Sequence, residues 1–245
     1  EFFMNEIHFA KSSGLNGIVL CEHFNAKDFL VIYDFLEKNF AYEGDRYIIE
    51  GISLFPAMEV SIKNKGHVIL AGERDSIIDI YEILKEFREK DNLIELEALL
   101  DQADIFNLLK IGAHPCRKGH KLCNQPHDLL KRLDGLDLNG KDIFKKGESI
   151  AKDELINLSQ ELGLNIITGS DSHTPIQLGG IYTSLNKECS TIKELKECIV
   201  KGDYTIEINS ALNFKIFSSK ILKRYLLKSE TYDKNTERSE ERRVG

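Results

Sequence analysis

The sequence predicts an α/β fold built around parallel strands. Three short apolar runs, at residues 18–23, 111–115 and 165–175, stop abruptly at polar residues that include a histidine. The last run is too short for a helix and is bounded by Gly169 and Pro175, which is typical of a buried parallel strand. Segments with helical periodicity separate the runs. In an α/β barrel or an open α/β sheet, ligands bind where such strands end.

The amino-terminal half alternates predicted helices with predicted strands. Apolar residues recur every three or four positions in four segments, which predicts helices at 2–13, 26–40, 76–90 and 93–109. Strands are expected at 17–23, 54–62, 67–72 and 110–113. The residues before Gly66 suit a turn that joins two of these strands.

The carboxyl-terminal half continues the alternation, with clearer signals at the helix ends. Helices are expected at 127–133, 151–162, 191–202 and 213–228, and strands at 136–139, 165–169 and 204–208. Gly163 suits the end of one helix. Thr191 and Glu194 form a capping box at the start of the next.

Composition is that of an ordinary globular protein. The chain has 245 residues, of which 42% are hydrophobic and 30% charged, enough for one large α/β domain. No apolar run approaches the about 20 residues of a membrane span, so we expect no membrane association. The net charge of -7 argues against long nucleic acid as a partner. A small phosphorylated substrate stays possible, because a bound metal supplies local positive charge.

The five cysteines favour reduced thiols and a cytoplasmic location. Cys116 and Cys123 flank a loop that contains His120, with His114 and His127 just outside it. These residue types are those of a small zinc site. The spacing matches no zinc finger or ribbon, so we do not expect one.

Three segments are expected along the chain. Residues 1–212 form the α/β domain, residues 213–228 a basic amphipathic helix, and residues 229–245 a disordered tail. Residues 238–245 resemble translated sequencing adapter, so we expect them to be non-native. The chain begins inside a helix, without a Met or a preceding strand, and we therefore expect it to lack the first strand of its domain.

Six potential metal ligands lie in or at the ends of predicted strands: His23, Glu59, His67, His114, Asp171 and His173. Glu59 is the most informative, because a carboxylate inside a buried strand is costly unless it is paired or metal-bound. Imidazoles and carboxylates together are ligands for Zn, Mn or Fe. Ions held close together bind a phosphate ester, ionise a water molecule and stabilise the leaving oxygen.

The order of these motifs resembles the PHP (polymerase and histidinol phosphatase) superfamily of metal-dependent phosphoesterases. Residues 21–25 (Cys-Glu-His-Phe-Asn) are similar to a family motif that is normally Thr-Asp-His-Asn. Residues 57–60 with 66–70 are similar to the next motif. Residues 113–117 and 169–173 are similar to later ones. The resemblance covers about residues 1–210.

The resemblance implies a distorted (β/α)7 barrel, similar to a TIM barrel, with a cluster of two or three divalent ions at the carboxyl ends of its strands. Within the cluster, Glu59 would bridge two ions. His67 and His114 would complete one position, Asp171 another, and His23 with His173 a third. Asp171 and Arg117 are the candidate catalytic residues, and Arg117 would grip the substrate phosphate. Glu22 stands where the family has Asp and would orient His23.

One family motif is absent from this sequence. The first motif is a strand ending in His-x-His, and the chain begins one helix after the place where it would stand. We expect the parent protein to be a hydrolase and the chain as given to bind metal incompletely and to be weakly active or inactive.

The leading prediction is hydrolysis of a small phosphorylated metabolite by a metal-activated hydroxide. A 3′–5′ nuclease or nucleotide phosphatase of the same family is the alternative, and a non-catalytic PHP-like accessory module is a third. An amidohydrolase-like metal barrel acting on C–N bonds is a fourth, but its usual carbamylated-lysine pattern is not identifiable. The substrate, the native metal and the oligomeric state do not follow from the sequence.

Overall fold

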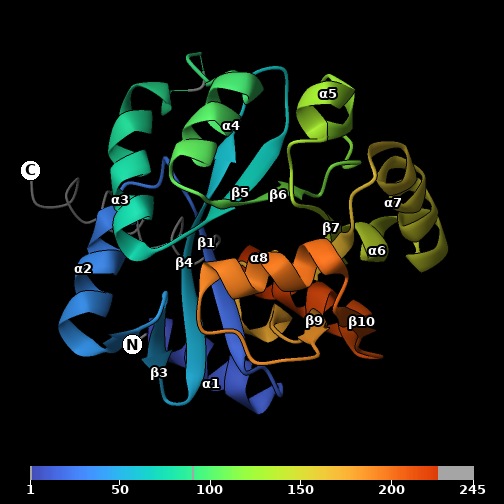
Figure 1. Ribbon diagram of the computed structural model, residues 1–245. Helices are drawn as coiled ribbons and strands as arrows, with labels where there is room; N and C mark the ends of the chain where they lie inside the picture. Colours follow the sequence, from blue (N-terminus) through green and yellow to red (C-terminus); the bar gives the residue numbers. More distant parts are fainter. Residues whose placement is uncertain (1, 90, 226–245) are drawn as a thin grey trace, which may run out of the picture.

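The computed structural model describes residues 2–89 and 91–225, and its described part has a large mixed sheet with helices packed around it (Figure 1). The sheet contains β1 (Gly17–His23), β2 (Ala41–Glu43), β3 (Arg46–Ile49), β4 (Ile52–Ser61), β5 (His67–Ala71), β6 (Leu109–Ala113), β7 (Gly135–Asn139) and β8 (Ile166–Gly169). A separate antiparallel pair contains β9 (Ile181–Leu185) and β10 (Tyr204–Ile208).

The helices connect these strands. They are α1 (Phe2–Ser12), α2 (Phe29–Asn39), α3 (Arg74–Ile83), α4 (Leu96–Ile105), α5 (His127–Leu130), α6 (Gly140–Lys146), α7 (Glu148–Leu162) and α8 (Ile192–Lys201). Three short 3-10 turns, at Leu84–Phe87, Leu122–Asn124 and Pro175–Gln177, complete the described elements. None of the described helices has the length and apolar character needed to cross a membrane.

The centre of the sheet is antiparallel and its far end is parallel. Strand β4 pairs in parallel with β1 on one edge, and on the other edge it pairs antiparallel with β3 and then β5. Strand β5 is antiparallel to β6, and β6, β7 and β8 run parallel. The predicted turn between β4 and β5 is present. Such a short connection can join only antiparallel strands.

The sheet does not close into a barrel, and this corrects the expected (β/α)7 architecture. Closure requires every strand to be paired on both edges. In the described part of the chain, β1 and β8 are the two strands that would have to pair for closure, and they are not hydrogen-bonded to each other. The β9–β10 pair lies against β8 instead, where the Thr183 hydroxyl accepts a hydrogen bond from the Thr168 amide at 3.1 Å. The fold is therefore a mixed α/β fold with an open central sheet.

Most predicted elements are present, and the exceptions are short. The predicted helix at 76–90 ends earlier, as α3 followed by a 3-10 turn to Phe87. Strands β2, β3 and β9 have too few alternating apolar residues to be predicted. Helix α6 is absent from the predicted elements, because Gly140 disfavours a helix. The Asn139 side chain nevertheless caps α6 by accepting a hydrogen bond from the Lys141 amide at 2.9 Å.

The two predicted helix-end signals are confirmed. Gly163 ends α7 in the left-handed conformation, at φ 70°. Thr191 and Glu194 make both hydrogen bonds of the capping box that starts α8. Such caps satisfy backbone groups that have no partner inside the helix, and each stabilises the helix by about 1 kcal/mol.

The core lies between the sheet and helices α2, α3 and α4. Phe29 of α2 stacks on Tyr81 of α3 with ring centroids 4.4 Å apart. Leu70 of β5 and Met58 of β4 are fully buried and belong to the same core cluster as these helix residues. This packing fixes the strands that carry the candidate ligands.

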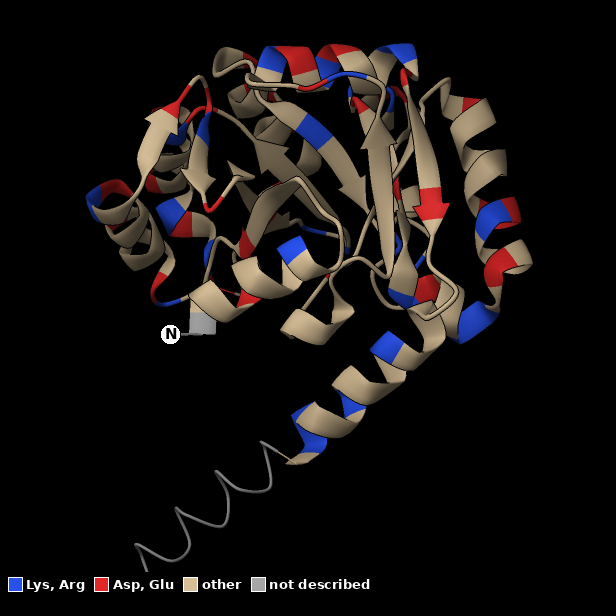
Figure 2. Ribbon diagram, turned by 90° about the horizontal axis from the view of Figure 1, so that it is seen from below, with Lys and Arg blue, Asp and Glu red and all other residues tan. Residues whose placement is uncertain are grey.

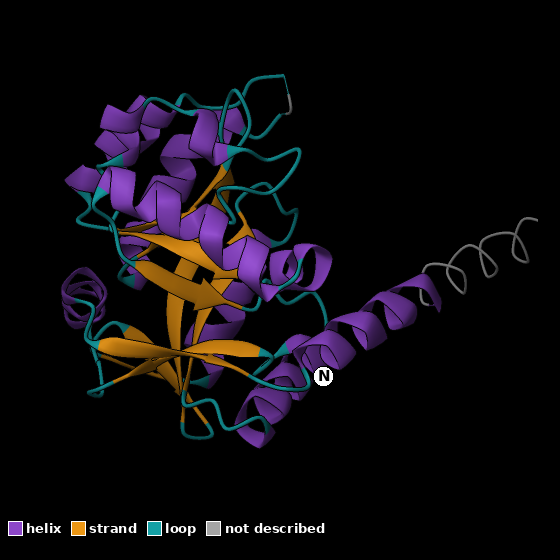
Figure 3. Ribbon diagram, turned by 90° about the vertical axis from the view of Figure 1, so that its right-hand side faces the viewer, coloured by secondary structure: helices purple, strands orange, loops and turns teal. Residues whose placement is uncertain are grey.

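Residues 212–225 are helical and extend away from the body of the protein (Figures 2 and 3). Leu212 and Ile216 at its start are buried, whereas Phe214 and Tyr225 are exposed. The expected tail at 229–245, with its non-native end at 238–245, lies outside the described residues. The division of the chain near residue 212 stays a prediction.

Candidate metal centre

Three adjacent strands deliver Glu59, His67 and His114 to one edge of the sheet. Glu59 lies near the carboxyl end of β4, His67 opens β5, and His114 follows β6 directly. Because β5 runs antiparallel to both of its neighbours, its first residue lies beside their last ones. The register pairs His67 with Ser61 on one side and with Ala113 on the other.

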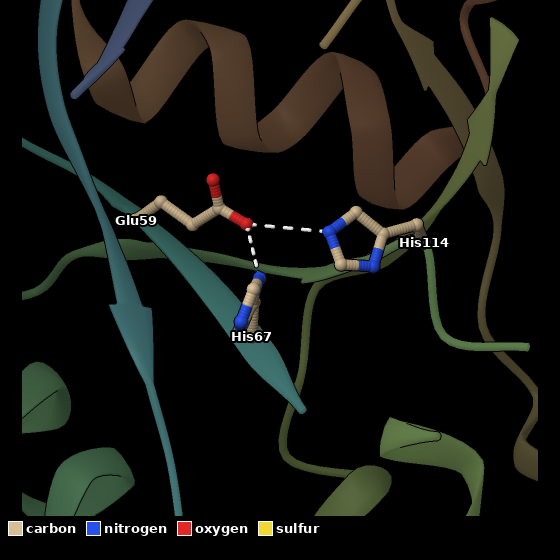
Figure 4. A group of neighbouring side chains, drawn as sticks. All are labelled: Glu59, His67 and His114. Carbon is tan, nitrogen blue, oxygen red and sulfur yellow. Dashed lines mark hydrogen bonds and ion pairs between the residues drawn. The ribbon is translucent and has the colours of Figure 1, made fainter. Parts of the chain in front are cut away.

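The three side chains meet at a single carboxylate oxygen (Figure 4). Glu59 Oε1 lies 2.7 Å from His67 Nδ1 and 3.3 Å from His114 Nε2. One ligand atom from each residue lies within 4.8 Å of the other two. Ligands of a tetrahedral zinc ion, with bonds of about 2.0–2.1 Å, lie roughly 3.3 Å apart. The donor set and its spacing therefore fit a divalent ion.

Glu59 stays ionised in this setting. Burial raises the pKa of its carboxyl group, but hydrogen bonds from His114 and His67 outweigh this effect and lower the pKa below the usual range. His114 is only 4% exposed, and its Nδ1 atom has no hydrogen-bond partner among the described residues. An ionised carboxylate between two imidazoles is the charge state that metal binding requires.

His23 lies next to this group. The parallel register of β1 and β4 pairs His23 with Glu59. His23 Nε2 lies 3.8 Å from Glu59 Oε2, and the His23 ring packs edge-on against His67 with centroids 5.8 Å apart. This position adds a further imidazole on the second oxygen of Glu59.

Asp171, His173 and Arg117 gather in a second group. Asp171 Oδ1 lies 3.5 Å from His173 Nδ1, and Asp171 Oδ2 lies 2.9 Å from Arg117 Nη1. Arg117 also donates from Nε to Asp142 Oδ1 at 3.0 Å. Lys141 Nζ lies 2.9 Å from Asp171 Oδ1. The carboxylate of Asp171 is thus held by two cationic side chains. Burial raises its pKa, and the charges of Lys141 and Arg117 reverse this and lower it.

Asp137 and Asn139 of β7 connect the two groups. Asp137 Oδ2 accepts from the His114 backbone amide at 3.2 Å and from Asn139 Nδ2 at 2.9 Å. Asn139 Nδ2 also lies 3.4 Å from Asp171 Oδ2. The predicted residues at Glu59, His114 and Asp171 therefore lie along the same edge of the sheet, although Glu59 and Asp171 make no direct contact in the described structure.

Asp137 and Asn139 are absent from the residues predicted from the sequence, although Asp137 could have been identified. Asp137 lies in a fully buried strand, as Glu59 lies in β4, and the same argument about buried carboxylates applies to it. Burial raises the pKa of Asp137 to about 6. Lys141 and His120 were also missed as neighbours of the site.

Two residues at this edge adopt a backbone conformation that is uncommon for side chains other than glycine. His114 has φ 34° and directly follows β6, and Asp171 has φ 47° and lies two residues after β8. Such conformations cost on the order of 1–3 kcal/mol and are typical of functional sites. They turn both side chains toward the strand ends.

A cleft of about 490 Å³ lies beside His67. The turn between β4 and β5 lines it with Lys63 and Lys65, and His120 lines it from the loop after β6. The His120 ring lies 4.7 Å from His67. Burial, followed by the charges of His67 and His114, lowers the pKa of His120.

The cysteines take no part in this arrangement. The part of the chain that the structure describes contains one group of three residues suited to a metal ion, Glu59, His67 and His114, with no cysteine in it. All five cysteines are free thiols. Burial raises the pKa of Cys116 to about 12, which keeps it protonated and a poor ligand.

Comparison with known families gives one match. Residues 150–204 match a family model described as PHP-associated. No curated protein matches the chain by sequence.

Solved structures share the fold at low sequence identity. PsfC from Pseudomonas syringae PB-5123 is 18% identical with a TM-score of 0.72, over 92% of this chain and 90% of that one. The lesion-specific endonuclease PfuEndoQ from Pyrococcus furiosus is 19% identical with a TM-score of 0.60, over 83% of this chain and 52% of that one.

A third structure carries the family name. It is a two-domain protein from Bacteroides vulgatus that contains a predicted PHP-like metal-dependent phosphoesterase, 16% identical with a TM-score of 0.55, over 88% of this chain and 64% of that one. The match at residues 150–204 and the shared fold confirm the resemblance to the PHP superfamily that the sequence motifs predicted.

Proposed function

We propose that this protein is a metal-dependent phosphoesterase that hydrolyses a small phosphorylated metabolite. The observation that carries the proposal is the convergence of Glu59, His67 and His114, from three neighbouring strands, on one point at the sheet edge. Two imidazoles and a carboxylate with an open side form the ligand pattern of catalytic zinc and related ions. When bound there, a divalent ion polarises a phosphoryl oxygen and ionises a water molecule.

The protein's own residues suit the remaining tasks. Glu59, His67 and His114 would anchor the ion. Arg117 would bind the phosphate, because its Nε and Nη1 are committed to Asp142 and Asp171 while its buried Nη2 has no hydrogen-bond partner among the described residues. A buried guanidinium with a free donor favours an oxyanion ligand. The proposed role of Asp171 is to orient Arg117.

The cleft beside His67 would receive the organic part of the substrate. Its volume of about 490 Å³ is in the range of small-molecule sites. Lys63 is paired with Glu95 at 2.7 Å, so Lys65 and His120 are the cleft residues best suited to contact a polar leaving group. This arrangement favours a compact, polar metabolite.

A nuclease or nucleotide phosphatase is the second candidate. The shared fold with PfuEndoQ favours it, and one related solved structure is an Endonuclease Q complex with a 27-mer duplex carrying an abasic lesion. The net charge of -7 counts against long nucleic acid. The two candidates use the same metal position and differ in the substrate.

A substrate panel tests the proposal. Small phosphomonoesters, nucleotides and DNA duplexes would be assayed with Mn, Zn and Fe. We expect turnover of small phosphomonoesters that His114→Ala reduces by at least about 10³-fold, and His8→Ala, at an exposed histidine, leaves unchanged. An unchanged rate in His114→Ala contradicts the metal mechanism. Turnover of none of the substrates favours the non-catalytic module.

A further inference from the structure

The carboxylate of Asp171 has both oxygens engaged by cations of the protein itself. Oδ1 is paired with Lys141 Nζ at 2.9 Å, and Oδ2 with Arg117 Nη1 at 2.9 Å. The Asp171 side chain is 15% exposed, so little solvent screens these pairs. By contrast, no lysine or arginine in the described part of the chain pairs with Glu59, whose partners are all imidazoles.

The ammonium of Lys141 lies where a metal ion bound by Asp171 and His173 would lie. Asp171 Oδ1 and His173 Nδ1 are 3.5 Å apart, a separation that suits two ligands of one divalent ion. Lys141 Nζ lies 2.9 Å from the first and 2.9 Å from the second. The ammonium donates to the same lone pairs that a metal ion would use.

The backbone places Lys141 there. It is the second residue of α6, and its amide is held at 2.9 Å by the side chain of Asn139, which caps the helix. The Lys141 side chain is 20% exposed. Since Asn139 also contacts Asp137 and Asp171, the capping residue links the position of the helix to the carboxylates it faces.

A divalent ion at this position would meet two like charges at short range. Lys141 would have to leave, and Arg117 would remain on the other oxygen of Asp171. Both effects weaken metal binding there and are absent at Glu59. We propose that the Lys141 ammonium takes the place of a metal ion at Asp171 and His173, so that divalent ions bind at Glu59, His67 and His114 alone.

This inference rests on the metal position used in the proposed function and adds the number of divalent ions that one chain binds. In place of the further ions that the family resemblance implies, the chain would supply positive charge from Lys141 and Arg117. These fixed charges face the phosphate position from the β8 side of the site. The substrate class implied is a phosphate ester held between one metal ion and the two cationic side chains of Lys141 and Arg117.

Metal content per chain tests the inference without any activity measurement. The protein would be loaded with Mn²⁺, dialysed and analysed by mass spectrometry of the metal. We expect about one equivalent in the wild type and in Asp171→Asn, and almost none in His114→Ala. Lys141→Met should gain up to about one further equivalent, because it frees Asp171 and His173. Lys145→Met, an exposed lysine on the same helix, is the control and should stay at the wild-type value.

Electron paramagnetic resonance of the Mn²⁺ proteins gives a second reading. The wild type should show the spectrum of an isolated ion, and Lys141→Met the additional coupling of neighbouring ions. A wild type that holds more ions and loses one in Asp171→Asn overturns the inference, as does a Lys141→Met protein whose metal content does not rise. Circular dichroism identifies any variant that fails to fold, and His173→Asn then replaces Asp171→Asn. If the wild type itself retains no metal after dialysis, the result counts against the proposed function.

Discussion

Two carboxylates at the same edge of the sheet are held in different ways. Glu59 is surrounded by the imidazoles of His23, His67 and His114, whereas Asp171 is surrounded by the ammonium of Lys141 and the guanidinium of Arg117. An imidazole can give up its proton and become a metal ligand, but a guanidinium cannot. We therefore expect ligand-type residues to hold a metal ion only where their other neighbours can become neutral.

The largest expected effect separates the two carboxylates directly. Glu59→Gln should remove the bound metal and reduce kcat/KM by at least about 10³-fold, because the remaining imidazoles lose their shared anion. Asp171→Asn should retain the metal and lose about 10-fold to 100-fold, because Arg117 and Lys141 lose their anchor.

Steady-state kinetics with metal analysis checks this pair of variants. Glu43→Gln, an exposed carboxylate on β2, is the matched control and should behave as the wild type. Equal losses in Glu59→Gln and Asp171→Asn, with equal loss of metal, would remove the distinction between the two sites.

The next effect concerns stability at the Asp171 side. Arg117→Met leaves Asp142 and Asp171 without their common cation, and the free energy of unfolding should fall by about 3 kcal/mol. Arg132→Met breaks two pairs between a half-buried arginine and exposed carboxylates and should cost less than about 1 kcal/mol. Urea denaturation of both variants measures the difference. Equal losses would show that the Arg117 pairs behave as surface pairs.

The smallest effect is a pH dependence that arises at Asp137, between the two sites. Burial raises the pKa of this carboxyl group above its unfolded value of about 3.9. Between these two pKa values, the folded protein holds a proton that the unfolded chain has lost. The free energy of unfolding should therefore be greatest below the unfolded pKa and decrease as pH rises toward the folded pKa.

Asp137→Asn should lack this decrease, which we expect to be on the order of 1–3 kcal/mol. Urea denaturation at pH 4, 5, 6 and 7, with EDTA to remove metal, would give the wild-type minus variant difference at each pH. A difference that does not change with pH would show that Asp137 titrates normally in the folded protein.

Much of the fold could be predicted from the sequence. Long periodic segments and capping residues located the main helices, and apolar runs located β1, β4, β5, β6, β7 and β8. A missing first strand is expected from the sequence, but the arrangement of the remaining sheet edges could not be predicted, because it depends on which strands meet in space. The resemblance to a barrel family predicted a closed arrangement. In the structure, β8 pairs with β7 on one edge and contacts Thr183 on the other, so it does not pair with β1.

The candidate ligands could be predicted because they stand at strand ends, but their partners could not. Lys141 follows a strand that was predicted, yet its contact with Asp171 depends on where α6 begins, and Gly140 gave no sign of a helix there. A metal ligand and a salt-bridged carboxylate look the same in a sequence. The catalytic and metal roles of the predicted residues stay predictions until the metal analysis is done.

The pairing of β4 has a consequence for how the gene can vary. This strand is bonded to β1 along one edge and to β3 and β5 along the other, so its register is fixed from both sides. Inserting or deleting a single codon within residues 52–58 would turn Glu59 to the opposite face of the sheet. We therefore expect length changes to be eliminated from this segment and to accumulate in surface loops that carry no candidate site residue.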